Sequence, residues 1–315
     1  MRVNAMGLPV REDQGGTSRS EAAEGRIRRR EFIRWAAGLF ALGSSVRSPL
    51  PAAATPPNRP SNIRLARDEA QREVPLSSLQ EPVRSKVRQI VAYPTVFRRM
   101  PIEVVPCDPD LYVFLVRYPE IVVSMWQLMG VTKVTLHRKG PYAYDARDGA
   151  GTVSQVELVY GTREKHLFLA EGYYDGPLLP RRVTGRCAVL LTSTYSMDQN
   201  KNDYITNQLD VFLQVDNAGA ELVAKTLHPL LGRTVDSNFS ETVRFVSQVS
   251  HVAESNGPGV QRMVTRLTDV DPSVRERFAQ IATTLNQRAI MKAMSDPQPP
   301  TERFGELTRE KEAVN

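Results

Sequence analysis

The sequence TVSQVELVYGTREKHLFLAEGYYDGP, residues 152–177, decides the fold class. It contains two runs rich in β-branched, aromatic and alternating apolar residues, 152–160 and 165–173, and a turn signal with glycine follows each run. Runs of this length between glycine, proline and aspartate are typical of paired antiparallel strands. The stretch therefore predicts a β-hairpin, from which the rest of a sheet can be traced in both directions.

Four further runs of the same character flank this hairpin, and turn residues mark their ends. They are Val131–Arg138, Tyr142–Arg147, Val183–Tyr195 and Tyr204–Val215. A short strand is also predicted earlier in the chain, at Met100–Val105. The expected sheet therefore has about seven antiparallel strands.

Two short helices are predicted between the first strand and the others. Asp108 precedes Pro109, and this pair marks a helix start because aspartate caps free N–H groups and proline suits the first helical position. That helix is expected to end at Arg117, and Pro119 to begin a second one that ends at Met129.

A long helical pattern closes the domain. Apolar residues recur at helical spacing from Ala218 to about Ala253. Pro229 and Gly232 should bend this helix, because proline removes a backbone donor and clashes with the preceding turn. A kinked C-terminal helix is therefore expected to stand off the sheet.

The order of these elements, over residues 96–254, resembles the helix-grip fold of the START-like, polyketide-cyclase-like and birch-pollen-allergen-like superfamily. The resemblance implies an α+β domain in which a curved antiparallel sheet wraps around the long C-terminal helix. Members of this superfamily mostly hold lipids, sterols or aromatic small molecules between sheet and helix, and a minority are enzymes. The resemblance lies in element order and length, so no functional positions are carried over from it.

The segments outside this domain have their own patterns. Residues 55–75 lack apolar periodicity and are predicted to be a disordered linker, whereas helical spacing predicts an N-terminal helix within 76–95. Two further surface helices are expected within 257–295, and 296–315 is predicted to be a disordered tail.

Strand alternation and the helix-grip architecture together suggest which side chains line a cavity. Methionine and aromatic side chains suit an adaptable apolar pocket. The predicted ligand-binding residues are Met125, Trp126, Tyr144, Val156, Leu158, Tyr160, Phe168, Leu209, Val211, Leu213, Leu227 and Leu231. For any single one of them, a place in an ordinary packed core is the simpler interpretation.

Groups suited to catalysis are few. Glu157, Glu171 and Asp210 lie in mid-strand opposite the apolar face, which predicts solvated positions, and His228 lies beside the expected bend. An enzyme of the cyclase or hydrolase type would need one of these four in a pocket with a strongly shifted pKa. The sequence has no P-loop, no nucleophile elbow and no C-x-x-C pattern. We therefore predict no catalytic residue, no metal and no cofactor.

An arginine-rich motif followed by an apolar run lies near the beginning of the chain. Residues 28–34 read RRREFIR, and residues 35–43 read WAAGLFALG. This order resembles a twin-arginine export signal, in which paired arginines and two bulky apolar residues precede a short hydrophobic region. The positions that match the signal are Arg29, Arg30, Phe32 and Ile33.

The export signal implies a bacterial protein with an export translocase as partner. Three small residues predict cleavage after Ala54, so that 1–54 is a signal peptide and the mature chain is periplasmic or secreted. The alternative interpretation is a basic amphipathic helix at the start of a cytosolic protein. In an oxidising compartment Cys107 and Cys187 can pair, but nothing in the sequence brings them together, and we expect two separate buried thiols.

Charge argues against nucleic acid as a partner, and hydropathy argues against a membrane-spanning segment. Of the net charge of +6, the first 54 residues contribute nine arginines against five acidic residues. The remaining chain has 32 basic and 30 acidic residues, which is too even for binding to nucleic acid phosphates. No apolar stretch is long enough to predict a transmembrane segment in the mature chain.

Three hypotheses follow from the sequence. The first is an exported protein that binds an apolar or amphipathic, lipid-like small molecule between the sheet and the C-terminal helix. The second is a cavity enzyme that uses a buried carboxylate or histidine. The third is a non-catalytic envelope scaffold whose partner surfaces lie on the added helices, and a large exposed apolar patch there would favour it.

Overall fold

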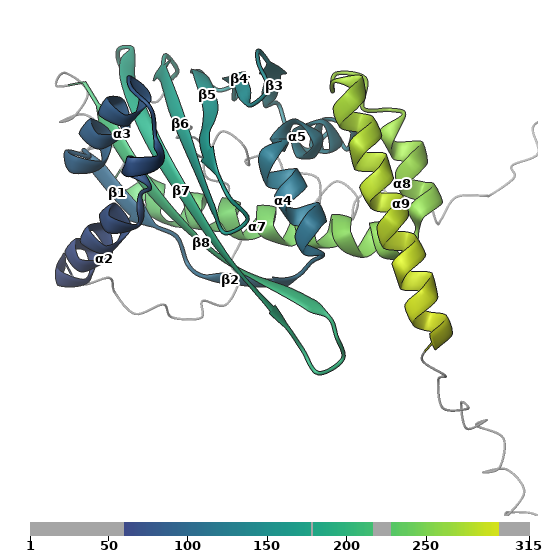
Figure 1. Cartoon of the computed structure of the whole chain (residues 1–315). Coiled ribbons are helices and arrows are strands. Elements are labelled where there is room, and N and C mark those ends of the chain that lie inside the picture. Colours follow the sequence, from purple (N-terminus) through teal and green to yellow (C-terminus); the bar gives the residue numbers. More distant parts are fainter. Residues whose placement is uncertain (1–59, 178, 217–227, 296–315) are drawn as a thin grey trace, which may run out of the picture.

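A computed structural model describes residues 60–177, 179–216 and 228–295 (Figure 1). Eight strands of this part form one antiparallel sheet in the order β1-β8-β7-β6-β5-β4-β3, and β2 pairs with the far end of β8. The strands are β1 (Val96–Arg99), β2 (Glu103–Pro106), β3 (Thr135–Arg138), β4 (Ala143–Arg147), β5 (Thr152–Gly161), β6 (Lys165–Tyr174), β7 (Val183–Met197) and β8 (Asp203–Val215).

Seven α-helices of the described chain surround the sheet. They are α2 (Pro60–Glu73), α3 (Val83–Ala92), α4 (Pro109–Arg117), α5 (Pro119–Leu128), α7 (His228–Ser255), α8 (Gly257–Val264) and α9 (Pro272–Ser295). The Asp108 carboxylate caps α4 by accepting hydrogen bonds from the N–H groups of Asp110 and Leu111, both at 2.9 Å. None of these helices is long and apolar enough to cross a membrane.

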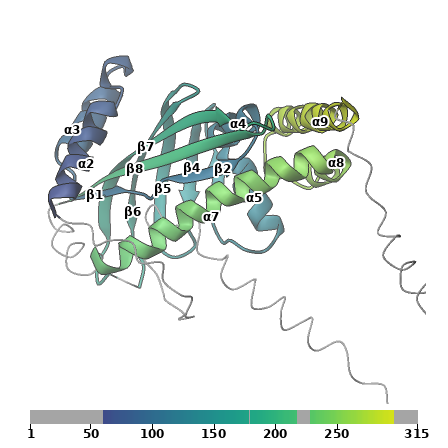
Figure 2. The same cartoon turned by 90° about the horizontal axis from the view of Figure 1, so that it is seen from below.

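Helices cover the two faces of the sheet differently (Figures 1 and 2). On the outer face, Val87 and Ile90 of α3 pack against Leu167, Ala188 and Phe212 of the three central strands. On the inner face, α7 crosses the sheet and its Phe239 and Val243 belong to one cluster with Leu191 and the partly buried Val211. The sheet is therefore a middle layer with helices on both sides.

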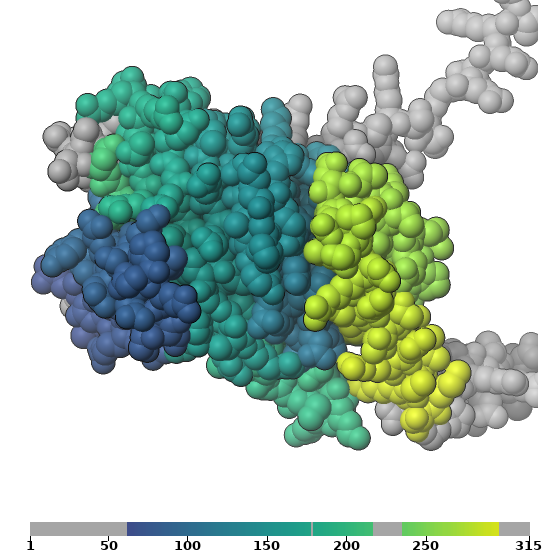
Figure 3. All heavy atoms as spheres, turned by 45° about the horizontal axis from the view of Figure 1, so that its top comes forward, coloured from purple at the N-terminus to yellow at the C-terminus, as the bar shows by residue number. Residues whose placement is uncertain are grey.

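A second, helical core continues from one end of the sheet. It joins α4 and α5 to the second half of α7 and to α8 and α9. The rings of Trp126 and Phe245 lie 5.5 Å apart, and Phe114 stacks on Phe278 at 6.0 Å between ring centroids. Figure 3 shows α8 and α9 as a ridge on the molecular surface beside the sheet domain.

The predicted α+β helix-grip fold, with its antiparallel sheet and long C-terminal helix, is confirmed. The sheet has one strand more than expected, because the run predicted at Met100–Val105 is replaced by β1 and β2 on either side of Pro101. Helix α7 is described from His228 onward, so the predicted beginning of this helix at Ala218 and the turn before Pro229 lie outside the described residues. The expected bend thus falls at the beginning of the described helix.

The structure also differs from the prediction before the sheet. Residues 60–73, predicted as part of a linker at 55–75, form helix α2, and the helix expected within 76–95 is a single 3-10 turn at Leu76–Ser78 followed by α3. Helix α2 has little apolar patterning, but Ala70 is completely buried in the outer-face cluster, the group of apolar residues that includes Val87, Ile90, Leu167, Ala188 and Phe212. Packing against the sheet, rather than its own periodicity, stabilises this helix.

Candidate functional site

The inner face of the sheet carries a continuous apolar surface on β5 to β8. Its centre is formed by three buried residues, Ala170, Cys187 and Val189. Five partly buried side chains pack against them: Val156, Phe168, Leu209, Val211 and Leu213. We call these eight residues the inner-face cluster. No residue of a described helix belongs to it.

The pairing of the strands explains why these side chains lie together. Phe168 is opposite Leu158 on one side and Val189 on the other, and Val189 is in turn opposite Val211. Directly paired residues of antiparallel strands project on the same face. Four strands thus contribute to one apolar surface, which α7 meets at Val211 and Leu209 through Phe239, Val243 and Val235.

Besides Tyr144 of β4, half of the predicted ligand-binding residues share this face. They are Val156, Leu158, Phe168, Leu209, Val211 and Leu213. Tyr160 lies on the opposite face, because a bulge between Leu158 and Tyr160 shifts the register and pairs Tyr160 with Leu167. Leu227 and the side chain of Leu231 lie outside the described residues.

Met125 and Trp126 are not at the inner face. Both are buried in the helical core, where the indole of Trp126 packs against Phe245. Tyr144 does face inward, since it pairs with Val156, but only 2% of its surface is exposed. These three side chains therefore act as packing residues in the described structure.

A buried histidine lies at the edge of the inner-face cluster. His166 is two residues before Phe168 on β6 and has no exposed surface. Arg117, the last residue of α4, donates from Nε to His166 Nε2 at 3.3 Å and from Nη2 to the carbonyl of Thr162 at 3.1 Å. Burial, and then the charge of Arg117, lower the pKa of His166 to about 4.

The neutral ring of His166 has one unused donor. Because Nε2 accepts from Arg117, the ring proton belongs on Nδ1. Nδ1 is buried and has no hydrogen-bond partner in the described part of the chain. No motif in the sequence marks His166 as a candidate, although strand alternation places it on the same face as Phe168.

A buried ion pair lies beyond Tyr144 at the start of α5. Arg138 Nε donates to Glu120 Oε1 at 3.0 Å, and the guanidinium carbon lies 5.5 Å from the ring centroid of Tyr144. Glu120 Oε2 is buried without a hydrogen-bond partner among the described residues. Burial, with the charge of Glu120, raises the pKa of Tyr144. The corner between α4 and α5 thus places polar groups beside an otherwise apolar face.

The carboxylates considered for catalysis do not face inward. Glu157 is exposed, and Glu171 accepts a hydrogen bond from Lys86 Nζ of α3 at 2.6 Å on the outer face. Asp210 is also on the outer side, but the expectation that it is solvated is wrong. It is 3% exposed and forms a two-pronged ion pair with Arg99, at 2.8 and 3.0 Å. The side chain of His228 lies outside the described residues.

Neither a metal centre nor a reactive thiol emerges from the described ranges. No group of three or more His, Cys, Asp or Glu side chains there is arranged to hold a metal ion. Cys107 and Cys187 are free and buried, and burial raises the pKa of each thiol to about 12. A thiol with so high a pKa is a poor nucleophile.

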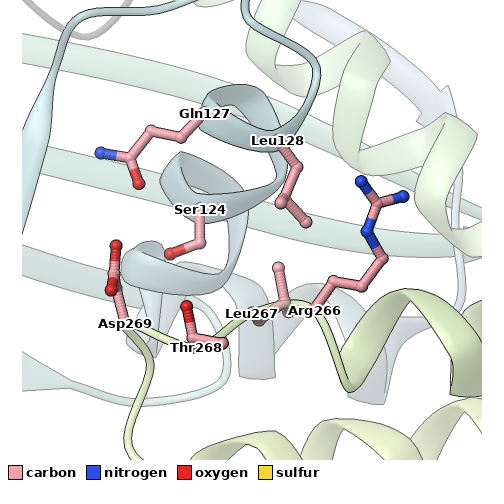
Figure 4. A pocket seen from close by; sticks show the side chains of 7 residues that line it. All are labelled: Ser124, Gln127, Leu128, Arg266, Leu267, Thr268 and Asp269. Atoms are coloured by element: carbon pink, nitrogen blue, oxygen red, sulfur yellow. The ribbon is translucent and has the colours of Figure 1, made fainter.

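A pocket lies away from the sheet, between α5 and the turn that joins α8 to α9 (Figure 4). Its volume is about 160 Å³. The residues that line it are Ser124, Gln127, Leu128, Arg266, Leu267, Thr268 and Asp269. None of them was singled out from the sequence, because two distant segments supply them and no motif joins these segments.

No protein-family model matches the sequence, and no curated protein matches it. Similar solved structures include a conserved protein from Geobacillus kaustophilus, at 10% identity over 47% of this chain and 97% of that chain, with a TM-score of 0.28. The di-domain ARO/CYC BexL from the BE-7585A biosynthetic pathway matches at 17% identity over 60% of this chain and 55% of its own, with a TM-score of 0.24.

A truncated norcoclaurine synthase from Thalictrum flavum is similar at 11% identity over 47% of this chain and 94% of that chain, with a TM-score of 0.27. At such identities and TM-scores, these likenesses assign neither a ligand nor a reaction to this chain.

Proposed function

We propose that this chain is an exported binding protein that holds an apolar or amphipathic, lipid-like small molecule on the inner face of its sheet. The inner-face cluster is the observation that carries the proposal. Five apolar side chains remain partly exposed there, and of these the described helices meet only Leu209 and Val211, through α7. Small-molecule sites are mostly apolar surfaces with a few polar groups that fix orientation.

The polar groups at the edge of this face favour an amphipathic ligand. Among the described residues, the Nδ1–H of His166 is an unused donor, and Glu120 Oε2 is an unused acceptor. A buried polar atom without a partner costs about 1–3 kcal/mol, which a ligand hydroxyl or carbonyl group would recover. A ligand that makes apolar contacts along β5 to β8 and polar contacts near the α4–α5 corner would be an apolar molecule with one polar end.

A single valine on the inner face should control affinity. Val156→Ser is expected to raise the Kd for the neutral apolar dye N-phenyl-1-naphthylamine about fivefold, because it removes roughly 1 kcal/mol of apolar contact. Val159→Ser is the matched control: it changes the same residue type on the same strand, at a partly buried position in the outer-face cluster. Fluorescence titration measures both variants.

The dye titration separates the two faces. The proposal requires Val156→Ser to bind dye more weakly than Val159→Ser while urea unfolding shows similar stabilities. Equal dye affinity in the two variants and the unaltered chain would contradict a site on the inner face.

The export half of the proposal rests on the arginine motif at the start of the chain. We expect Arg29→Lys together with Arg30→Lys to leave the full-length precursor in the cytoplasm, because the export machinery reads the arginine pair. Pulse labelling followed by cell fractionation and mass determination of the exported chain tests this. An exported chain that begins at Thr55 supports the proposal, and unchanged export of the double variant would refute the twin-arginine route.

A further inference from the structure

The pocket between α5 and the α8–α9 turn has polar side chains that nothing in the described chain uses. Ser124, Arg266, Thr268 and Asp269 form no side-chain hydrogen bond and no ion pair with the described residues. Ser124 is 8% exposed, whereas the side chains of Arg266, Thr268 and Asp269 are exposed to solvent. The pocket is therefore lined by two hydroxyls, one guanidinium and one carboxylate that form no hydrogen bond or ion pair with one another.

The arrangement of these groups separates the two charges. Figure 4 shows Ser124 and Thr268 pointing toward one another, with Asp269 to one side and Arg266 to the other, beside Leu128. A ligand between them would meet an acceptor at one end and a planar group of donors at the other. The apolar side chains of Leu128 and Leu267 would lie against its middle.

The segment that carries the charged groups is held in place before any ligand arrives. Leu267 is 1% exposed and Val270 is 2% exposed, so the two residues on either side of Thr268 and Asp269 are anchored in the helical core. The N–H of Leu267 donates to the carbonyl of Val264 at 3.1 Å, and the N–H of Val270 donates to that of Leu267 at 3.2 Å. A fixed segment loses little conformational entropy on binding.

We propose that this pocket binds a small dipolar molecule, with a cationic group at Asp269 and an anionic group at Arg266. The volume of about 160 Å³ suits a ligand of roughly the size of benzene, about six non-hydrogen atoms, which a cavity of about 150 Å³ accommodates. Short amino acids in which a few methylenes separate the two charges have this size and charge pattern. The site is distinct from the inner face of the sheet, so this proposal and the proposed function are tested independently.

The test uses three probes of equal chain length on the full chain. The dipolar probe is 4-aminobutyrate, and butyrate and n-butylammonium each carry only one of its two charges. Binding is followed by the amide NMR signals of Thr268 and Asp269. We expect saturable shifts with 4-aminobutyrate at millimolar concentration and a Kd at least about fivefold weaker for either single-charge probe.

Two charge-removing variants and one control complete the test. Arg266→Gln and Asp269→Asn should each weaken 4-aminobutyrate binding about fivefold. Arg262→Gln, which removes an exposed charge in the last turn of α8, just before this segment, should leave binding unchanged. Butyrate binding as tight as that of 4-aminobutyrate, with no effect of Asp269→Asn, would overturn the proposal in favour of a simple anion site. Absence of saturable shifts, or equal weakening in all three variants, would also overturn it.

Discussion

Replacing Arg99 with methionine is expected to lower the free energy of unfolding by about 3 kcal/mol, because it leaves the buried carboxylate of Asp210 without its counter-ion. Arg99 donates to both carboxylate oxygens of Asp210 from β1, at 2.8 and 3.0 Å. It also donates to Glu69 of α2 at 2.6 Å, so the same side chain ties α2 to the sheet. Urea unfolding at pH 7 measures the loss.

The pH dependence of this loss has a definite sign. Burial raises the pKa of Asp210, and removal of Arg99 should raise it further. A carboxyl group whose folded pKa is raised contributes stability at pH values below its unfolded pKa, and this contribution is lost as pH rises through the folded pKa. The difference between the unaltered chain and Arg99→Met should therefore shrink as the pH falls from 7 toward 4.

Two comparisons make the Arg99 result specific. Arg163→Gln removes an ion pair with Asp110 whose two side chains are 50% and 58% exposed, and it should cost at most about 1 kcal/mol. The double variant Arg99→Met with Asp210→Leu should recover most of the stability, because no unpaired charge remains. A loss no larger than that of Arg163→Gln, or a loss that grows at acid pH, would contradict the buried ion pair.

His166 should give the protein an acid-sensitive stability. Its pKa is about 4 in the fold, against about 6.5 in an unfolded chain. A group whose folded pKa is lowered favours its neutral form, so its contribution is complete above the unfolded pKa and is lost as the pH falls from 6.5 toward 4. The uptake of one proton by His166 over this pH interval should lower the free energy of unfolding by about 3 kcal/mol.

A glutamine at this position should remove the effect. His166→Gln keeps an acceptor within reach of Arg117 but does not titrate, so its unfolding free energy should fall less between pH 6.5 and pH 4. His137→Gln replaces an exposed histidine on β3 and should leave the pH profile of the unaltered chain in place. Parallel pH profiles for His166→Gln and the unaltered chain would show that His166 does not titrate as a buried group.

The elements predicted well from the sequence are those that local chemistry specifies. Asp108 and Pro109 define the start of α4 through one carboxylate and one fixed backbone angle, and both act within a single turn. The strands of the main sheet lie between turn residues such as Asp148 and Gly149, which mark where a chain reverses. Alternation along β8 places Leu209, Val211 and Leu213 on one face of that strand, but the two faces of β6 are hard to separate from the sequence, and only the register shows that Phe168 shares the face of Val211.

The features that sequence reasoning missed depend on contacts between distant segments. The β5 bulge turns Tyr160 to the outer face. No residue in the run 152–160 predicts this bulge. Asp210 faces away from the inner face as expected, but there it pairs with Arg99 of β1, which also pairs with Glu69 of α2. Met125 and Trp126 were misplaced for the same reason. They are buried in the helical core with residues of α7, which lies far away in the sequence.

The most direct test of the central proposal is native mass spectrometry of the full chain purified from its own envelope. The account predicts one apolar or amphipathic molecule per chain, which N-phenyl-1-naphthylamine displaces and which Val156→Ser retains less well than Val159→Ser. A bare chain that takes up no dye after purification would contradict the account, because it would mean that the inner face of the sheet is filled by the protein itself.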